Sequence, residues 1–242
     1  MSAVKHIYED PASTAEACAE RVLNLLDAAL VDKPLATLAV SGGSTPKLMF
    51  EKMVGMKFDW SRVHLFFVDE RVVPPTDDLS NFKLANENLI SPAKIPAANV
   101  HRVQGELTPE EAGAAYLKDI QGFFQLVEGQ MPAFDVIHLG TGPDAHTASL
   151  FPGDSRLIED RDGVATATYS ESKKNWRVTL LPSVLLAARN TVFLVTGADK
   201  AEAIHSVLEG DYNPNRYPAQ LVARSGAKVE LFLDRAAARL VE

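Results

Sequence analysis

The segment Leu139-Gly140-Thr141-Gly142-Pro143-Asp144-Ala145-His146-Thr147-Ala148-Ser149-Leu150-Phe151-Pro152-Gly153 begins where a mainly apolar run, residues 134–139, ends. The run has the length and composition of a buried strand. Two glycines then allow the backbone to turn sharply. An acid and a histidine follow, and ligands of open α/β sheets bind at the carboxyl ends of strands. Asp144 and His146 are therefore candidate catalytic residues, although a plain connecting loop of this composition is also common.

Other apolar runs alternate with helix signals along the chain. Strands are expected over residues 35–40, 63–68, 134–139, 191–196 and 229–233, with shorter candidates over 163–169 and 177–181. Ser13 and Glu16 have capping-box spacing, and Thr108 begins another helix. Ser80 is placed to cap a helix that runs to about residue 89, and further helices are expected over 200–208 and 235–240. This alternation predicts an α/β fold with a Rossmann-like, mostly parallel sheet and helices on both faces.

Length and composition fit one domain over residues 1–242. Of these 242 residues, 46% are hydrophobic and 23% charged, and the formal net charge is −8. The acidic balance argues against nucleic acid or an anionic membrane as a partner. No run approaches the ~20 apolar residues of a membrane span, and no secretory signal opens the chain. We expect a cytoplasmic protein, monomeric or weakly homo-oligomeric, in which the single cysteine, Cys18, is buried.

The loop that follows the strand at 35–40 is a candidate phosphate site. It contains Gly42, Gly43, Ser44 and Thr45, and Pro46 fits the first turn of a helix. Exposed backbone N–H groups, hydroxyls and a helix N-terminus together suit an anion. The spacing is not that of a nucleotide P-loop, so a phosphorylated metabolite is favoured over ATP. A tight strand-to-helix turn without a ligand remains an equal alternative.

Charged residues end two more of the expected strands. Asp69 and Arg71 follow the strand at 63–68, where the arginine is suited to pair with a phosphate and the acid to accept hydrogen bonds or orient a proton donor. Lys200 opens the helix after the strand at 191–196, an unfavourable place for a cation unless an anion binds there. Solvated surface charges are the alternative in both places.

Two familiar site patterns are excluded, and no metal or cofactor is expected. Residues 140–145 match the Gly-x-Gly-x-x-Ala form of a dinucleotide fingerprint, but Pro152 ends any helix too early for it. The chain has no Gly-x-Ser-x-Gly nucleophile elbow. The remaining histidines lack metal-ligand spacing, and His64 and His138 lie inside apolar strands, which is typical of core positions.

Taken together and in this order, these motifs resemble the glucosamine-6-phosphate isomerase/6-phosphogluconolactonase family, and within it the lactonases. The matching segments are residues 41–46, 69–81, 144–153, 177–180, 197–201 and 229–237. Alanine stands at 145 where the family usually has glycine, and threonine at 141 where methionine is frequent. The resemblance implies the fold of the glucosamine-6-phosphate deaminases and ribose-5-phosphate isomerases.

The resemblance also implies hydrolysis of 6-phosphoglucono-δ-lactone without a cofactor, with a phosphorylated sugar lactone as the small-molecule partner. His146 matches the family's catalytic histidine, which acts as a general base, and Asp144 or Asp69 would orient it. Phosphate binding maps onto the 42–45 loop, Arg71 and Lys200, with Arg177 as a further candidate. A sugar-phosphate deaminase is the nearest rival, but it typically has Asn-Glu-Pro after its histidine, where this chain has Thr-Ala-Ser-Leu-Phe-Pro. A sensor that binds without turnover is the other alternative.

Overall fold

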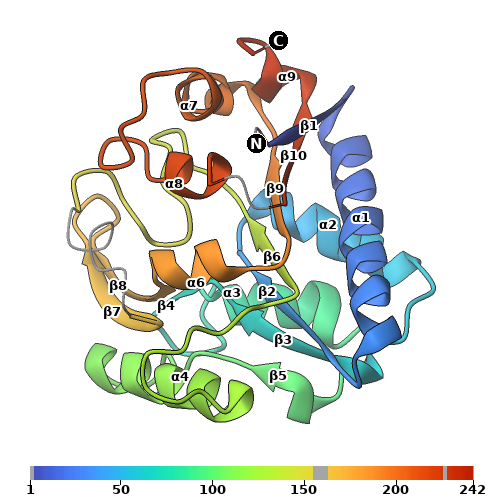
Figure 1. Cartoon of the computed structure of the whole chain (residues 1–242), viewed down its shortest axis with the longest axis vertical. Helices are drawn as coiled ribbons and strands as arrows, with labels where there is room; N and C mark the ends of the chain where they lie inside the picture. Colours follow the sequence, from blue (N-terminus) through green and yellow to red (C-terminus); the bar gives the residue numbers. More distant parts are fainter. Residues whose placement is uncertain (1–2, 155–162, 226–227, 242) are drawn as a thin grey trace.

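The computed structural model describes residues 3–154, 163–225 and 228–241, which form a parallel sheet covered by helices (Figure 1). The strands of this sheet are β1 (Val4–Tyr8), β2 (Ala36–Val40), β3 (Val63–Phe67), β5 (Val100–His101), β6 (Val136–Leu139), β9 (Thr191–Val195) and β10 (Val229–Asp234). Their order is β1-β10-β9-β6-β2-β3-β5, and every neighbouring pair is parallel. The five longer predicted strands are confirmed with small differences at their ends, whereas β1 and β5 were not predicted.

Helices cover both faces of the sheet, as expected. One face packs against α1 (Pro11–Asp32) and α2 (Ser44–Gly55), and the other against α4 (Pro109–Phe124), α6 (Pro182–Ala187), α7 (Ala201–Leu208), α8 (Ala219–Ala223) and α9 (Arg235–Ala238) (Figure 1). Successive side chains of a strand point to opposite faces. Leu38 and Val40 accordingly lie in the α1/α2 core, and Ala39 between them lies in the other core. Burial on both faces explains the almost continuous apolar character of these strands.

The strand order reverses next to the centre of the sheet. From β2 the chain moves outward through β3 to β5, and it then returns to β6, on the other side of β2. The loops that follow β2 and β6 therefore leave in opposite directions and open a crevice at the carboxyl ends of these strands. Ligands of open α/β sheets bind at such a switch point.

A second, antiparallel sheet stands over this edge. It consists of β4 (Asp69–Arg71), β8 (Asn175–Leu180) and β7 (Ala165–Ser170), in that order. The two short strands predicted near 163–169 and 177–181 are confirmed as β7 and β8, whereas β4 was not predicted. Val68 joins the sheets, since its N–H donates to the Val40 carbonyl at 3.0 Å and its carbonyl accepts from Leu180 N at 2.8 Å.

The observed N-termini of three helices show that one predicted helix start is wrong and that two are right. Helix α1 is capped by Asp10, whose side chain accepts from Ser13 N, so the proposed Ser13 and Glu16 capping box is wrong. Pro11 at the first helical position favours this earlier start. Helix α4 starts at Thr108 as expected, with Thr108 and Glu111 forming a capping box. Ser80 caps α3 (Asn81–Ala85), which continues into a π-helical turn, η2 (Asn86–Ile90).

The remaining short helical turns are η1 (Trp60–Arg62), η3 (Ala97–Asn99) and η4 (Ala198–Lys200). The expected helix at 200–208 is α7, which begins one residue later, and that at 235–240 is α9, which ends earlier. Cys18 is buried in α1, as predicted, and burial raises the pKa of its thiol. Within the described residues, no helix is both long and apolar enough to cross a membrane.

Candidate active site

A cavity of about 500 Å³ lies at the carboxyl ends of β2, β3, β6 and β9. Every predicted site residue except Asp144 lines it: Gly42, Gly43, Ser44, Thr45, Asp69, Arg71, His146, Arg177 and Lys200. The segments after β2, β3, β6 and β9 converge because they leave the parallel sheet at the same edge, whereas Arg177 comes from β8 of the antiparallel sheet. Side chains of Asn81 and Lys173, which the sequence analysis did not select, line it too.

His146 reaches the cavity from the loop after β6. Its Nδ1 lies 2.5 Å from Oδ1 of Asp144, and the same oxygen accepts from the backbone N–H of His146 at 3.3 Å. Burial alone would raise the pKa of Asp144, but the hydrogen bond and charge of His146 outweigh it and lower the pKa to about 2. A carboxylate held on Nδ1 fixes the imidazole tautomer in which Nε2 is free to accept a proton.

The backbone around His146 is folded tightly to present the ring. A Cβ on Gly142 would lie 2.3 Å from Cε1 of His146, so only glycine leaves room for the imidazole at 142. Ala145 has φ of +60°, a left-handed conformation that side chains disfavour. Two backbone bonds hold it there: its N–H donates to Gly142 O at 2.9 Å, and its carbonyl accepts from Ala219 N at 3.0 Å. The family's usual glycine at 145 thus matches the conformation that this alanine adopts.

Replacing Ala145 with glycine is expected to stabilise the fold. Left-handed backbone costs alanine about 1–2 kcal/mol, and the greater freedom of unfolded glycine offsets about 0.4–1 kcal/mol of the gain. We expect a net increase of about 0.5–1 kcal/mol in the free energy of unfolding, measured by urea denaturation. Ala114→Gly, the same change on the exposed side of α4, is the control and should destabilise by about 1 kcal/mol. Equal losses in both variants would show that Ala145 is not strained.

The predicted phosphate loop lies between β2 and α2. Gly43, with φ of +120°, precedes the first turn of α2, and none of the described side chains caps that helix. The N-terminal N–H groups of a helix are therefore directed at the cavity, where they suit an anion. Thr45 Oγ1 lies 2.9 Å from Thr196 Oγ1 across the opening. The loop thus has the donors and helix end that the sequence analysis expected of it.

Two neighbours fix the start of this loop. Ser41 Oγ donates to the carbonyl of His138 at 3.1 Å, and Ser41 N lies 3.4 Å from the Nδ1 of that residue. His138 is fully buried, as predicted for a core position, and burial lowers its pKa to about 3. On the other side, a Cβ on Gly42 would lie 1.8 Å from Oδ1 of Asn81. Glycine at 42 is therefore required by close packing against the Asn81 side chain.

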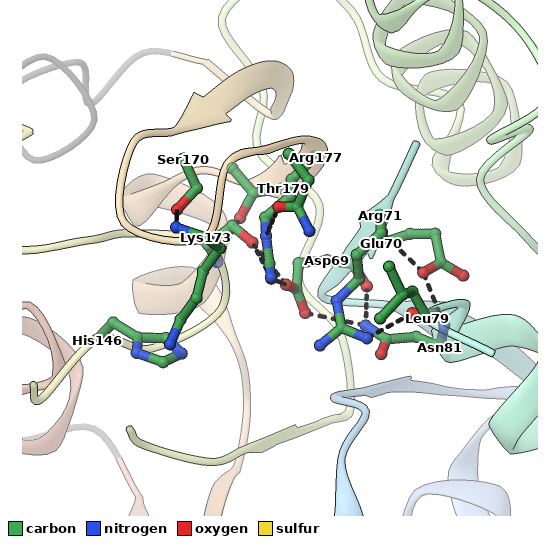
Figure 2. Close-up of polar contacts among 12 residues, drawn as sticks. Asp69, Glu70, Arg71, Leu79, Asn81, His146, Ser170, Lys173, Arg177 and Thr179 are labelled. Atoms are coloured by element: carbon green, nitrogen blue, oxygen red, sulfur yellow. Dashed lines mark hydrogen bonds and ion pairs between the residues drawn. The ribbon is translucent and has the colours of Figure 1, made fainter. Parts of the chain in front are cut away.

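Glu70 organises the segment that carries Asn81. Its buried carboxylate accepts from the backbone N–H groups of Arg71 and Asn81, each at 2.7 Å (Figure 2). It also accepts from the backbone N–H of Phe82 at 2.7 Å and from Ser80 Oγ at 3.0 Å. Burial raises the pKa of Glu70, although these four donors oppose the shift. Arg71 lines the cavity, and its Nη1 donates to the carbonyl of Leu79 at 2.5 Å. Glu70 and Arg71 are thus held in place by hydrogen bonds, and they do not form a cluster of freely solvated charges.

Asp69 is directed toward Arg177 and Ser149. Its Oδ2 lies 3.3 Å from Nη1 of Arg177 (Figure 2). The same oxygen accepts from Ser149 Oγ at 2.6 Å. This arrangement follows from the pairing of β4 with β8, which brings Asp69 opposite Thr179. Of the two acids proposed to orient His146, the structure therefore brings Asp144 to the imidazole. A direct catalytic role of Asp69 stays a prediction, as does phosphate binding by Arg177.

Lys200 lies at the start of α7, and its Nζ contacts the carboxylate of Asp199. It lines the cavity with about a fifth of its side chain exposed. Within the described residues, no cluster of three or more His, Cys, Asp or Glu side chains is arranged to hold a metal ion.

Sequence reasoning missed Asn81, Glu70 and Lys173. The Ser80-Asn81 pair was part of the family resemblance but had no assigned role, and Glu70 adjoins two predicted residues. Lys173 had no signal of its own, because it lies in a polar turn whose place over the cavity depends on the antiparallel sheet.

Comparisons with known proteins agree with the fold and the site. Residues 9–231 match the family model described as "Glucosamine-6-phosphate isomerases/6-phosphogluconolactonase". A 6-phosphogluconolactonase of a Nostoc species is 34% identical over 98% of both chains, and the human 6-phosphogluconolactonase is 38% identical over 84% of this chain and 80% of its own. The solved 6-phosphogluconolactonase of Trypanosoma brucei superposes with a TM-score of 0.88 at 27% identity, covering 100% of this chain and 99% of its own. On this evidence, the chain belongs to the glucosamine-6-phosphate isomerase/6-phosphogluconolactonase family.

Proposed function

We propose that the protein hydrolyses 6-phospho-D-glucono-1,5-lactone to 6-phospho-D-gluconate in the oxidative pentose phosphate pathway. The observation that carries the proposal is the Asp144–His146 pair beside a cavity rich in anion-binding groups. Relatives that match nearly the whole chain bear the name 6-phosphogluconolactonase, and they support lactone hydrolysis as the reaction class.

A general base and a polarised carbonyl are sufficient to open a lactone. Nε2 of His146 takes a proton from water while the water oxygen attacks C1, and the carbonyl electrons move onto the carbonyl oxygen. When the carbonyl re-forms, the bond from C1 to the ring oxygen breaks, and His146 returns its proton to that oxygen. Asp144 holds the ring in the required tautomer and stabilises the imidazolium that forms between these steps.

The phosphate would anchor the substrate so that C1 lies next to His146. The open N-terminus of α2, Arg71 and Lys200 supply the positive charge for this anchor. Binding energy at the phosphate then lowers the barrier at C1, because it holds water, base and carbon in place.

The segment after His146 disfavours the deaminase alternative. Thr147 and Ser149 are fully buried, and the hydroxyl of Ser149 donates to Asp69. Neither side chain ionises near neutral pH, whereas deamination requires proton transfers at both C1 and C2 of an opened sugar. The Asp144–His146 pair, as a proposed general base with its orienting acid, also favours an enzyme over a sensor that binds the sugar phosphate without turnover.

The decisive experiment offers the protein 6-phosphogluconolactone and glucosamine 6-phosphate in parallel. Acid release from the lactone, corrected for spontaneous hydrolysis, is expected to accelerate, and ammonia release from the amino sugar is expected to stay at background. The reverse result would establish the deaminase. Binding of both compounds without either product would establish the sensor.

A further inference from the structure

The turn between β7 and β8 brings one more cation to the cavity. Ser170 pairs with Asn175 across the hairpin, and residues 171–174 connect them. Ser170 tightens the connection, since its carbonyl accepts from Lys174 N at 2.7 Å and its hydroxyl accepts from Lys173 N at 3.3 Å. The side chain of Lys173 extends from this turn over the cavity toward the imidazole of His146 (Figure 2).

Among the described residues around the cavity, Lys173 has no ion-pair partner. The cations that line it are Arg71, Lys173, Arg177 and Lys200, and Asp69 is the one acid among the described lining residues. Asp69 pairs with Arg177, and Asp199 pairs with Lys200. Within the described part of the chain, no carboxylate lies within ion-pair distance of the Lys173 ammonium group.

A phosphate accounts for only part of this positive charge. It carries close to two negative charges at neutral pH. Under the proposed function, Arg71, Lys200 and the open end of α2 supply the positive charge for this group. The substrate gains its next negative charge at C1, first as the oxyanion of the tetrahedral intermediate and then as the carboxylate of the product. Lys173 approaches the cavity on the side of His146, which is the side where C1 must lie.

We propose that Lys173 is a catalytic residue whose ammonium group binds the C1 oxyanion and then the product carboxylate. The proposal rests on the proposed lactonase function. In the step concerned, water adds to C1, its proton moves to Nε2 of His146, and the carbonyl π electrons become the negative charge that Lys173 contacts. A fixed cation at the point where charge develops lowers the barrier more than it strengthens binding of the neutral carbonyl. Solvent exposure of the turn limits the size of the effect.

The test compares Lys173→Met with Lys174→Met. Both lysines are exposed and belong to the same turn, but Lys174 does not line the cavity. Two phosphorylated ligands are titrated by calorimetry: 6-phosphogluconate, which has a carboxylate at C1, and glucitol 6-phosphate, which has a neutral alcohol there. Turnover of 6-phosphogluconolactone is measured on the same preparations.

Lys173→Met is expected to lower kcat by about ten- to a hundredfold and to weaken 6-phosphogluconate binding by about tenfold. Binding of glucitol 6-phosphate should stay unchanged, and Lys174→Met should resemble the wild type throughout. Equal weakening of both ligands would place Lys173 at the phosphate and overturn the proposal, and so would an unchanged kcat. Failure of the wild type to open the lactone would instead refute the proposed function, which the turnover assay reports separately.

Discussion

Replacing His146 with alanine is expected to lower kcat for lactone opening by about 100- to 10,000-fold at pH 7, the usual cost of losing a general base. The ring has no substitute in the cavity, because no other histidine lines it among the described residues. The fold should survive, since about a fifth of the His146 side chain is exposed and the loop is held by backbone bonds. Initial rates from acid release, corrected for spontaneous hydrolysis, measure the effect.

His205→Ala is the matched control. This histidine lies on α7, outside the cavity, and contacts the carbonyl of Leu240. It should leave kcat unaltered, and both variants should unfold at denaturant midpoints close to that of the wild type. Near-normal turnover by the folded His146→Ala protein would show that His146 is not the general base.

Loss of the phosphate anchor should be the second large effect. Arg71→Ala and Lys200→Ala are each expected to reduce kcat/KM for the phosphorylated lactone, because leaving a buried charge unpaired costs about 2–5 kcal/mol, or about 30- to 5,000-fold. The loss in kcat/KM should be larger for Arg71→Ala, because the arginine is held by its hydrogen bond to the Leu79 carbonyl and its Nε is buried. The loss should be smaller for Lys200→Ala, because the lysine also forms an ion pair with Asp199.

A substrate without the phosphate separates anchoring from structural damage. Glucono-1,5-lactone should be a poor substrate for the wild type, and the two substitutions should barely change its kcat/KM. Lys52→Ala, which removes a lysine on α2 that pairs with Glu16, serves as the control and should affect neither substrate. Proportional losses on both lactones would mean that Arg71 and Lys200 support the fold and not the phosphate.

The sequence predicted those parts of the site that are local in the chain. Asp144 and His146 are two residues apart, so their contact depends on one loop. The parallel sheet followed from buried strands alternating with helices, and it brought the 42–45 loop, Arg71 and Lys200 to one edge as expected.

Features that depend on pairing between distant segments were not predictable in this way. Strand β4 has only three residues, and it exists because β8 lies beside it. The same pairing places Asp69 beside Arg177 and brings the turn with Lys173 to the cavity. At α1 the difficulty was different, because Asp10 caps the helix and Pro11 favours this start over the predicted one at Ser13.

The hydrogen bond from Ala219 N to the carbonyl of Ala145 makes the loop that carries His146 depend on a distant segment of the chain for its support. Helix α8 is itself fixed by Gln220, whose buried amide donates to the carbonyls of Ser206 and Asp211. The support therefore runs from the end of α7 through Gln220 to the backbone beside His146. Substitutions at Gln220, which does not line the cavity, are therefore expected to change the rigidity of the backbone beside His146 without altering any side chain that lines the cavity.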